Sequence, residues 1–227
     1  MNEIISNPKM IQMDNVSMKY KKDAFILQDI NISVDKGEFV FLVGPSGAGK
    51  STILRLLHRE IVPTSGRINV AGYNLSQMKI SELPRYRRKI GFVFQDFKLL
   101  PDRTVAQNVA LSLRVAGARR SHIRRSVDRV LEWTGLTHRR DALPEDISGG
   151  EQQRTAIARA IVNDPLILLA DEPTGNLDPD LSIEIMSLFE RYNKRGATVL
   201  VATHDVDLAE MFNKRIIVIH QGKIIKG

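Results

Sequence analysis

Residues 44–52 read GPSGAGKST, a glycine-rich loop of the kind that binds the phosphate groups of a nucleotide. An apolar run at 39–43 (FVFLV) predicts a buried strand before the loop, and the residues from Ser51 onward predict a helix after it. Glycine lets backbone N–H groups turn toward phosphate oxygens, and the helix presents its positive end to them. This context predicts a phosphate site rather than a chance glycine turn, with contacts from Gly44, Pro45, Ser46, Gly47, Ala48, Gly49, Lys50, Ser51 and Thr52.

A pair of carboxylates follows another predicted strand, at 166–170 (LILLA). Asp171 and Glu172 stand where a parallel sheet presents its carboxyl ends to a ligand. An acidic pair at a strand end is by itself more often the start of an ordinary loop, so this interpretation depends on the glycine-rich loop. With that loop, Asp171 and the Ser51 hydroxyl are expected to hold Mg²⁺, and Lys50 to reach the β- and γ-phosphates. Glu172 is expected to orient or deprotonate the attacking water.

Two single residues stand at the ends of other predicted strands. Gln95 follows the strand at 89–94, and its amide is expected to contact both the metal and the attacking water. His204 follows the strand at 197–203 and is expected to reach the γ-phosphate. Taken alone, each is an ordinary polar residue at a strand end. The functional interpretation rests on the rule that parallel strands present their carboxyl ends at one edge of the sheet.

A second glycine-rich segment, SGGEQ at 148–152, precedes a helical pattern far from the first loop. Its serine is expected to cap the helix, and its glycines leave the first turn bare, which offers a second anion site. One chain cannot easily bring two helix N-termini onto one γ-phosphate from opposite sides, whereas two chains arranged head to tail can. The segment therefore predicts an ATP-bridged dimer that hydrolysis releases, with contacts from Ser148, Gly149, Gly150 and Glu151.

The elements that position these residues alternate between strands and helices, which predicts a single α/β unit. A long segment from Thr104 to Ile161 shows only helical patterns, including a helix with Ser121 as its cap and Gly135 as its stop. A later helix is expected to start at the Asp178 cap and to end at Gly196. Strands are predicted at 9–20, 30–34, 39–43, 67–72, 89–94, 166–170, 197–203 and 215–220.

Composition and charge limit the class of protein. The 227 residues contain no cysteine, no apolar run near the ~18 residues that a membrane span needs, and no signal-peptide pattern at the N-terminus. A soluble protein of a reducing compartment fits best. The formal net charge is +7, which fits an acidic partner or merely a solvated helical face. The excess is local, in two clusters: Arg85, Arg87, Arg88 and Lys89, and Arg114, Arg119, Arg120, Arg124, Arg125, Arg129, Arg139 and Arg140.

Six elements follow one another along the chain: the loop at 44–51, Gln95, SGGEQ, the strand with its acidic pair, the segment at 176–178 and His204. Together and in this order, they resemble the nucleotide-binding subunits of ABC transporters. The resemblance covers essentially the whole chain. It implies ATP and Mg²⁺ as cofactors and a P-loop NTPase fold, with a mixed sheet core, an N-terminal antiparallel β subdomain and an all-helical insert.

The same resemblance implies boundaries and roles that spacing alone does not give. It implies one domain at 10–227, with a core at about 10–95 and 162–227 and a helical subdomain at about 96–161 that docks on a membrane partner. Tyr20 matches the aromatic residue that stacks on adenine, although a tyrosine at a strand end is ordinarily a packing residue. Asp178 matches a residue that contacts the opposite subunit.

Within the family, segments such as LLPDRTVAQNVAL and RGATVLVATHD resemble the FtsE-like cell-division ATPases. This implies an FtsX-like four-span membrane partner, regulation of cell-wall hydrolases, and a place on the cytoplasmic face of the bacterial inner membrane. ATPases of lipoprotein release and of macrolide or toxin export share DEPTGNLD and remain alternatives.

Two other classes fit less well. DNA-acting ABC ATPases carry a long coiled coil, whereas 59–147 has no sustained heptads, so no nucleic acid partner is expected. A scaffold that only binds ATP does not need Glu172. If the chain works at a membrane, the arginine clusters would contact anionic lipids.

Overall fold

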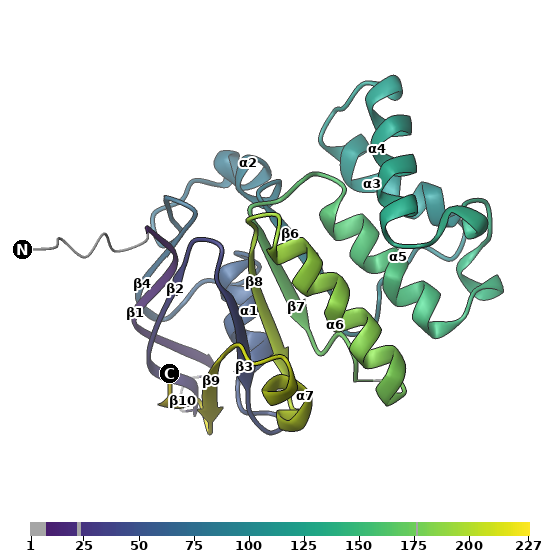
Figure 1. The fold of residues 1–227 in the computed structure, drawn as a ribbon. Coiled ribbons are helices and arrows are strands. Elements are labelled where there is room, and N and C mark those ends of the chain that lie inside the picture. Colours follow the sequence, from purple (N-terminus) through teal and green to yellow (C-terminus); the bar gives the residue numbers. More distant parts are fainter. Residues whose placement is uncertain (1–7, 22–23, 176) are drawn as a thin grey trace, which may run out of the picture.

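The computed structural model describes residues 8–21, 24–175 and 177–227, and it contains two β-sheets with helices on both faces of the larger one (Figure 1). The larger sheet has the strand order β10-β9-β3-β8-β7-β6, in which only β10 runs antiparallel to its neighbour. This mixed, mainly parallel sheet confirms the predicted fold class. Its strands are β3 (Phe39–Val43), β6 (Ile90–Val93), β7 (Ile167–Asp171), β8 (Thr198–Thr203), β9 (Arg215–His220) and β10 (Lys223–Lys226).

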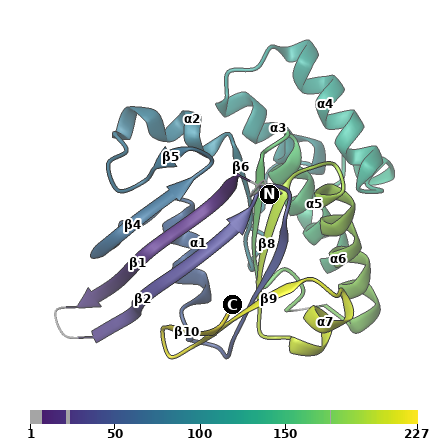
Figure 2. The same cartoon turned by 60° about the vertical axis from the view of Figure 1, so that its left-hand side comes forward.

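The smaller sheet is antiparallel throughout and has the strand order β2-β1-β4-β5. Helix α1 (Lys50–Leu57) lies between the two sheets (Figure 2), and apolar side chains from both sheets and from α1 form one continuous core. The phosphate loop therefore leads into a helix that is packed on two sides. The strands are β1 (Lys9–Lys21), β2 (Ala24–Asp35), β4 (Ser65–Val70) and β5 (Tyr73–Asn74).

Strand β3 shows why its sequence is apolar at every position. Phe39, Phe41 and Val43 point into a core shared with the helices on one face of the large sheet. Val40 and Leu42 point into the core that contains α1. Since successive side chains of a strand face opposite sides, a strand covered on both faces must be apolar throughout.

Three helices between β6 and β7 pack together, with α5 between the sheet and the outer helices (Figure 1). Their apolar side chains are continuous with the core on that face of the sheet. No helix in the described ranges is long and apolar enough to cross a membrane. The three are α3 (Val105–Val115), α4 (Arg120–Trp133) and α5 (Gly149–Ile161), followed in the chain by α6 (Pro179–Asn193) and α7 (Val206–Met211). Shorter elements are the 3₁₀ turns Ile80–Glu82, Thr137–Arg139 and Pro144–Asp146, and α2 (Leu83–Arg87).

Two of the predicted helix starts agree with the structure and one does not. Ser148 and Asp178 cap α5 and α6, each accepting a backbone N–H bond with its side chain. The predicted Ser121 cap is wrong, because α4 begins at Arg120 and its N-cap, Arg119, makes no side-chain cap bond. A side-chain cap stabilises a helix by only about 1 kcal/mol, so the packing of the helix can set a different start.

Candidate active site

The phosphate loop is tightly packed on its inner side and open on its outer side. A Cβ added at Gly44 would lie 2.2 Å from the backbone oxygen of Ile219, and one at Gly49 would lie 2.6 Å from a Leu27 methyl carbon. Gly47 has φ +79°, and a Cβ there would meet no atom within 4 Å. Two glycines are thus needed for close packing, whereas Gly47 gives a left-handed turn beside open space.

Lys50 is buried at the start of α1, and its ammonium group is held by the loop itself. Its Nζ donates to the carbonyl oxygens of Gly44 at 2.7 Å and Pro45 at 3.2 Å. The same Nζ lies 3.1 Å from Oε1 of Glu172. The predicted phosphate-binding cation and the predicted general base are therefore ion-paired across the sheet edge.

Glu172 is held on its other side by His204. Its Oε2 lies 2.9 Å from His204 Nδ1 and accepts the His204 backbone N–H at 3.2 Å. The carboxylate side chain is only 10% exposed, so both oxygens are largely enclosed by these partners. Glu172 has φ +46°, which is uncommon for a residue with a side chain, and its N–H bonds the Ala202 carbonyl at 2.9 Å.

A hydroxyl and a carboxylate meet beside this group. Ser51 Oγ donates to Asp171 Oδ1 at 2.9 Å, and the burial of Asp171 raises the pKa of its carboxyl. Mg²⁺ in nucleotide sites is typically bound by one or two protein oxygens together with phosphates and waters. The Ser51–Asp171 pair fits that donor set.

Gln95 stands at the same edge of the sheet. Strands β6 and β7 run parallel with Val93 opposite Ala170. Gln95 comes two residues after the end of β6, and on the neighbouring strand Asp171 ends β7 and Glu172 follows it. The side chain of Gln95 is exposed. The structure therefore brings Lys50, Glu172 and His204 into one contact network. The Ser51–Asp171 pair stands next to this network, and Gln95 follows the neighbouring strand.

The second glycine-rich segment forms an exposed helix start. Ser148 and Glu151 form a reciprocal capping box at the N-terminus of α5. Glu151 also accepts from Arg139 at 2.8 Å, and these hydrogen bonds, from Arg139 first and then from Ser148, lower its pKa to about 2. Gly149 is exposed with open space at its Cβ position, whereas Gly150 packs against Leu181.

A profile of the ABC transporter family matches residues 27–175. The chain belongs to the ABC transporter family. Three similar curated relatives carry the name cell division ATP-binding protein FtsE. That of Mycobacterium tuberculosis is 50% identical over 218 residues, covering 96% of this chain and 95% of the relative. That of Streptococcus pneumoniae is 49% identical over 217 residues, covering 96% of this chain and 94% of the relative. That of Escherichia coli is 46% identical over 218 residues, covering 96% of this chain and 98% of the relative.

Solved structures of other ATP-binding cassettes have the same fold. A dimeric cassette in a post-hydrolysis state, bound to ADP and Pi, has a TM-score of 0.87 at 37% identity, covering 95% of this chain and 97% of that one. A protein from Clostridium perfringens that is part of an ABC transporter complex has a TM-score of 0.88 at 31% identity, covering 96% of this chain and 87% of that one. This chain is thus an ATP-binding ABC ATPase.

In this ABC ATPase the two glycine-rich segments lie on different faces of the large sheet. Helix α1 contributes to the core beneath the smaller sheet, and α5 contributes to the core on the opposite face. The N-termini of α1 and α5 thus belong to helices on opposite faces of the sheet.

Two further residues, Asp178 and Tyr20, were predicted to contact the opposite subunit and the adenine. The exposed Asp178 uses a carboxylate oxygen to cap α6, accepting from Leu181 N–H at 2.9 Å. A carboxylate has lone pairs for more than one hydrogen bond, so this cap does not use all of its acceptor capacity. Tyr20 belongs to β1, but its side chain lies outside the described residues.

Two residues that sequence reasoning missed connect α5 to the segments that follow β6 and β7. Gln153 is buried and donates to the carbonyl of Pro173, which directly follows Glu172, at 2.6 Å. Arg159 donates to two backbone carbonyls just after Gln95. The signal that could have indicated Gln153 is a polar side chain on the buried face of a helix, since such groups must find partners.

Proposed function

We propose that this chain is the ATP-hydrolysing subunit of a bacterial cell-division complex. Two copies close on Mg-ATP, hydrolysis opens them, and an FtsX-like four-span membrane partner relays the movement to cell-wall hydrolases. The observation that carries the ATPase site is the enclosure of the Glu172 carboxylate between Lys50 and His204 at the end of β7. Identity of 46–50% to three FtsE proteins supports the cell-division role.

The side chains at the sheet edge have distinct proposed roles. Lys50 binds the β- and γ-phosphates in place of its present partner Glu172, whose carboxylate then orients the attacking water and accepts its proton. His204 contacts the γ-phosphate while its backbone N–H keeps Glu172 in place. Mg²⁺ would be held by Ser51 and Asp171, with Gln95 as a further oxygen ligand, and would neutralise charge on the phosphates.

The second copy would complete each site. Its Ser148–Glu151 segment offers the bare N-terminus of α5 to the γ-phosphate, because Gly149 leaves the backbone N–H groups accessible. Asp178 would contact the opposite copy, and Tyr20 would stack on adenine. Removal of the γ-phosphate then weakens the attraction between the copies.

A groove beside β6 supports the proposed membrane partner. It has a volume of about 610 Å³ and lies between α2 and the α3–α5 segment. Two apolar side chains on its rim are strongly exposed, Ile80 at 88% and Val115 at 82%. Exposed apolar side chains around a groove are typical of a docking site for another protein. This supports residues at about 96–161, within a domain at 10–227, as the subdomain that meets the partner.

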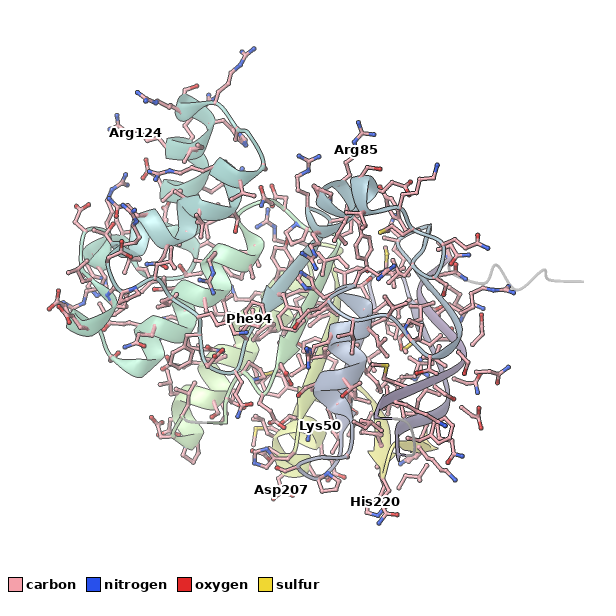
Figure 3. The ribbon with its side chains drawn as sticks, turned by 180° about the vertical axis from the view of Figure 1, so that it is seen from behind. Lys50, Arg85, Phe94, Arg124, Asp207 and His220 are labelled. Carbon is pink, nitrogen blue, oxygen red and sulfur yellow. The ribbon has the colours of Figure 1, made fainter. Side chains whose placement is uncertain are left out.

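Arginines surround this end of the molecule. Figure 3 shows Arg85 and Arg124 at the end opposite Lys50. If the groove faces the partner, these side chains face the inner leaflet, where each arginine contributes about 1 kcal/mol of attraction to anionic lipid. The proposed location is the cytoplasmic face of the bacterial inner membrane.

Capture of the closed dimer tests the assignment. Glu172→Gln protein with Mg-ATP is expected to bind nucleotide, to stay closed and to retain its membrane partner in detergent-solubilised native membranes. Mass spectrometry of the captured proteins should find a four-span FtsX-like protein together with regulators of wall hydrolases. Lys50→Ala protein, which cannot bind the phosphates, is the control.

Two results would contradict the proposal at different levels. A captured lipoprotein- or drug-handling permease would reject the cell-division role and leave the ATPase assignment intact. Hydrolysis at the parental rate by the Glu172→Gln variant would reject Glu172 as the base.

A further inference from the structure

The turn after Gln95 has an unusual backbone. Phe97 has φ +55° and Lys98 has φ +48°, so two successive residues with side chains lie in the left-handed region. The turn is closed by a backbone bond from Phe97 N–H to the Phe94 carbonyl at 3.3 Å and another from Lys98 N–H to the Asp96 carbonyl at 2.5 Å. Such conformations persist only where the surrounding structure holds them.

Arg159 of α5 supplies that restraint. Its Nη2 donates to the Phe97 carbonyl and its Nη1 to the Lys98 carbonyl, both at 2.5 Å. The planar guanidinium carries its N–H groups in a fixed fork, so it binds both successive carbonyls in one orientation. The turn and the helix that begins at the SGGEQ segment are thereby fastened together.

The anchor is itself held from a third element. Ser112 of α3 donates its hydroxyl to the Arg159 backbone carbonyl at 3.1 Å. Arg159, Ser112 and Lys98 all line the groove beside β6. Displacement of α5 or α3 would therefore pull on the turn that follows Gln95.

We propose that Arg159 is a positioning residue that fixes the turn at 96–98 and thereby sets where Gln95 stands. This rests on the role of Gln95 in the proposed function. Arg159 touches no reacting group, and its effect passes through Phe97 and Lys98.

Steady-state ATPase kinetics of the full chain test the proposal. Arg159→Ala is expected to lower kcat on the order of tenfold to a hundredfold, while KM for ATP changes less than about twofold, because a misplaced group costs rate rather than phosphate binding. Arg159→Lys, which can bond one carbonyl but lacks the fork, should fall between. Arg154→Ala is the matched control, since Arg154 lies on the same helix and its side chain pairs with Glu184 at 3.7 Å.

A rescue experiment separates positioning from simple structural support. Glycine adopts positive φ without strain, so Lys98→Gly added to Arg159→Ala should restore a large part of kcat. Hydrogen exchange at the amides of Phe97 and Lys98, followed by mass spectrometry, should become at least about tenfold faster in Arg159→Ala than in Arg154→Ala, because exchange reports local opening.

Unchanged exchange at these amides, or equal losses of kcat in the Arg159→Ala and Arg154→Ala variants, would overturn the proposal. If Arg159→Ala does not fold, the Arg159→Lys variant gives the same comparison. Full kcat in a Gln95→Ala variant would instead reject the proposed role of Gln95, while faster exchange in Arg159→Ala would still establish the anchor.

Discussion

Substitution of Gly44 by alanine should damage both the stability of the fold and nucleotide binding. The new Cβ would stand 2.2 Å from the Ile219 backbone oxygen and 3.2 Å from its carbonyl carbon. Real Cβ atoms essentially never come within 3.0 Å, so the loop or β9 must move by about 0.8 Å. The clash is between backbone segments, and β9 is paired with β3 through Val218 and Val43. Because of this pairing, β9 cannot easily move away from the loop.

The expected loss in the free energy of unfolding is about 3 kcal/mol, at the upper end for an overpacked site, because no side chain can rotate away. Gly47→Ala is the matched variant. Its added methyl meets open space, so only the positive φ of +79° opposes it, at about 1 kcal/mol.

Urea unfolding followed by circular dichroism measures both variants. With a slope of about 2–3 kcal/mol per molar urea, the Gly44→Ala midpoint should fall by about 1 M, and that of Gly47→Ala by less than half as much. ATP should stabilise the Gly44→Ala protein less than the parent, because the moved Gly44 carbonyl is the 2.7 Å partner of Lys50. Equal midpoints for the two variants would refute the close-packing argument.

Two further predictions concern the metal and pH. Ser51→Ala should raise the Mg²⁺ concentration for half-maximal hydrolysis on the order of tenfold, since it removes both a ligand and the 2.9 Å bond to Asp171, whereas Ser51→Thr should retain near-parental values in the same titration. Burial, and then the nearby charge of Arg87, lower the pKa of His58 from 6.5 to about 4. The unfolded chain therefore takes up this proton first, and stability should fall as pH drops from about 6.5 to 4. Urea midpoints across that window should change less in His58→Gln; an equal change would show that other groups dominate.

The strands and their functional ends were predictable because one physical rule places them. A strand buried on both faces is apolar throughout, so 39–43 could be recognised from composition, and it matches β3, in which all five residues are buried. The apolar stretch inside 215–220 likewise matches β9, although the residues at both ends of β9 are exposed. Since parallel strands end at a common edge, the residues after them could be brought together without knowing any distance. The glycine-rich loop then indicated that the chemistry at this edge is nucleotide binding.

What could not be predicted depends on contacts between distant segments. Arg159 stands in a helical pattern, where an arginine is ordinarily a surface residue. No neighbouring residue in the sequence indicates that its side chain contacts Phe97 and Lys98. Glu172 combines a positive φ with a backbone bond to Ala202 on the neighbouring strand, and no local sequence pattern indicates either feature. The short elements α2, α7, β5 and β10 were missed because they hold too few residues for a period to appear.

The separation of α1 and α5 onto opposite faces of the sheet has a genetic consequence. If two copies share their sites, the phosphate loop of one chain works only with the SGGEQ segment of the other. A chain disabled at Lys50 and a chain disabled at Ser148 would then each be inactive alone, yet a mixed pair would contain one intact site. Co-expression of two dead alleles should thus return part of the activity, a complementation that no enzyme with a self-contained site can show.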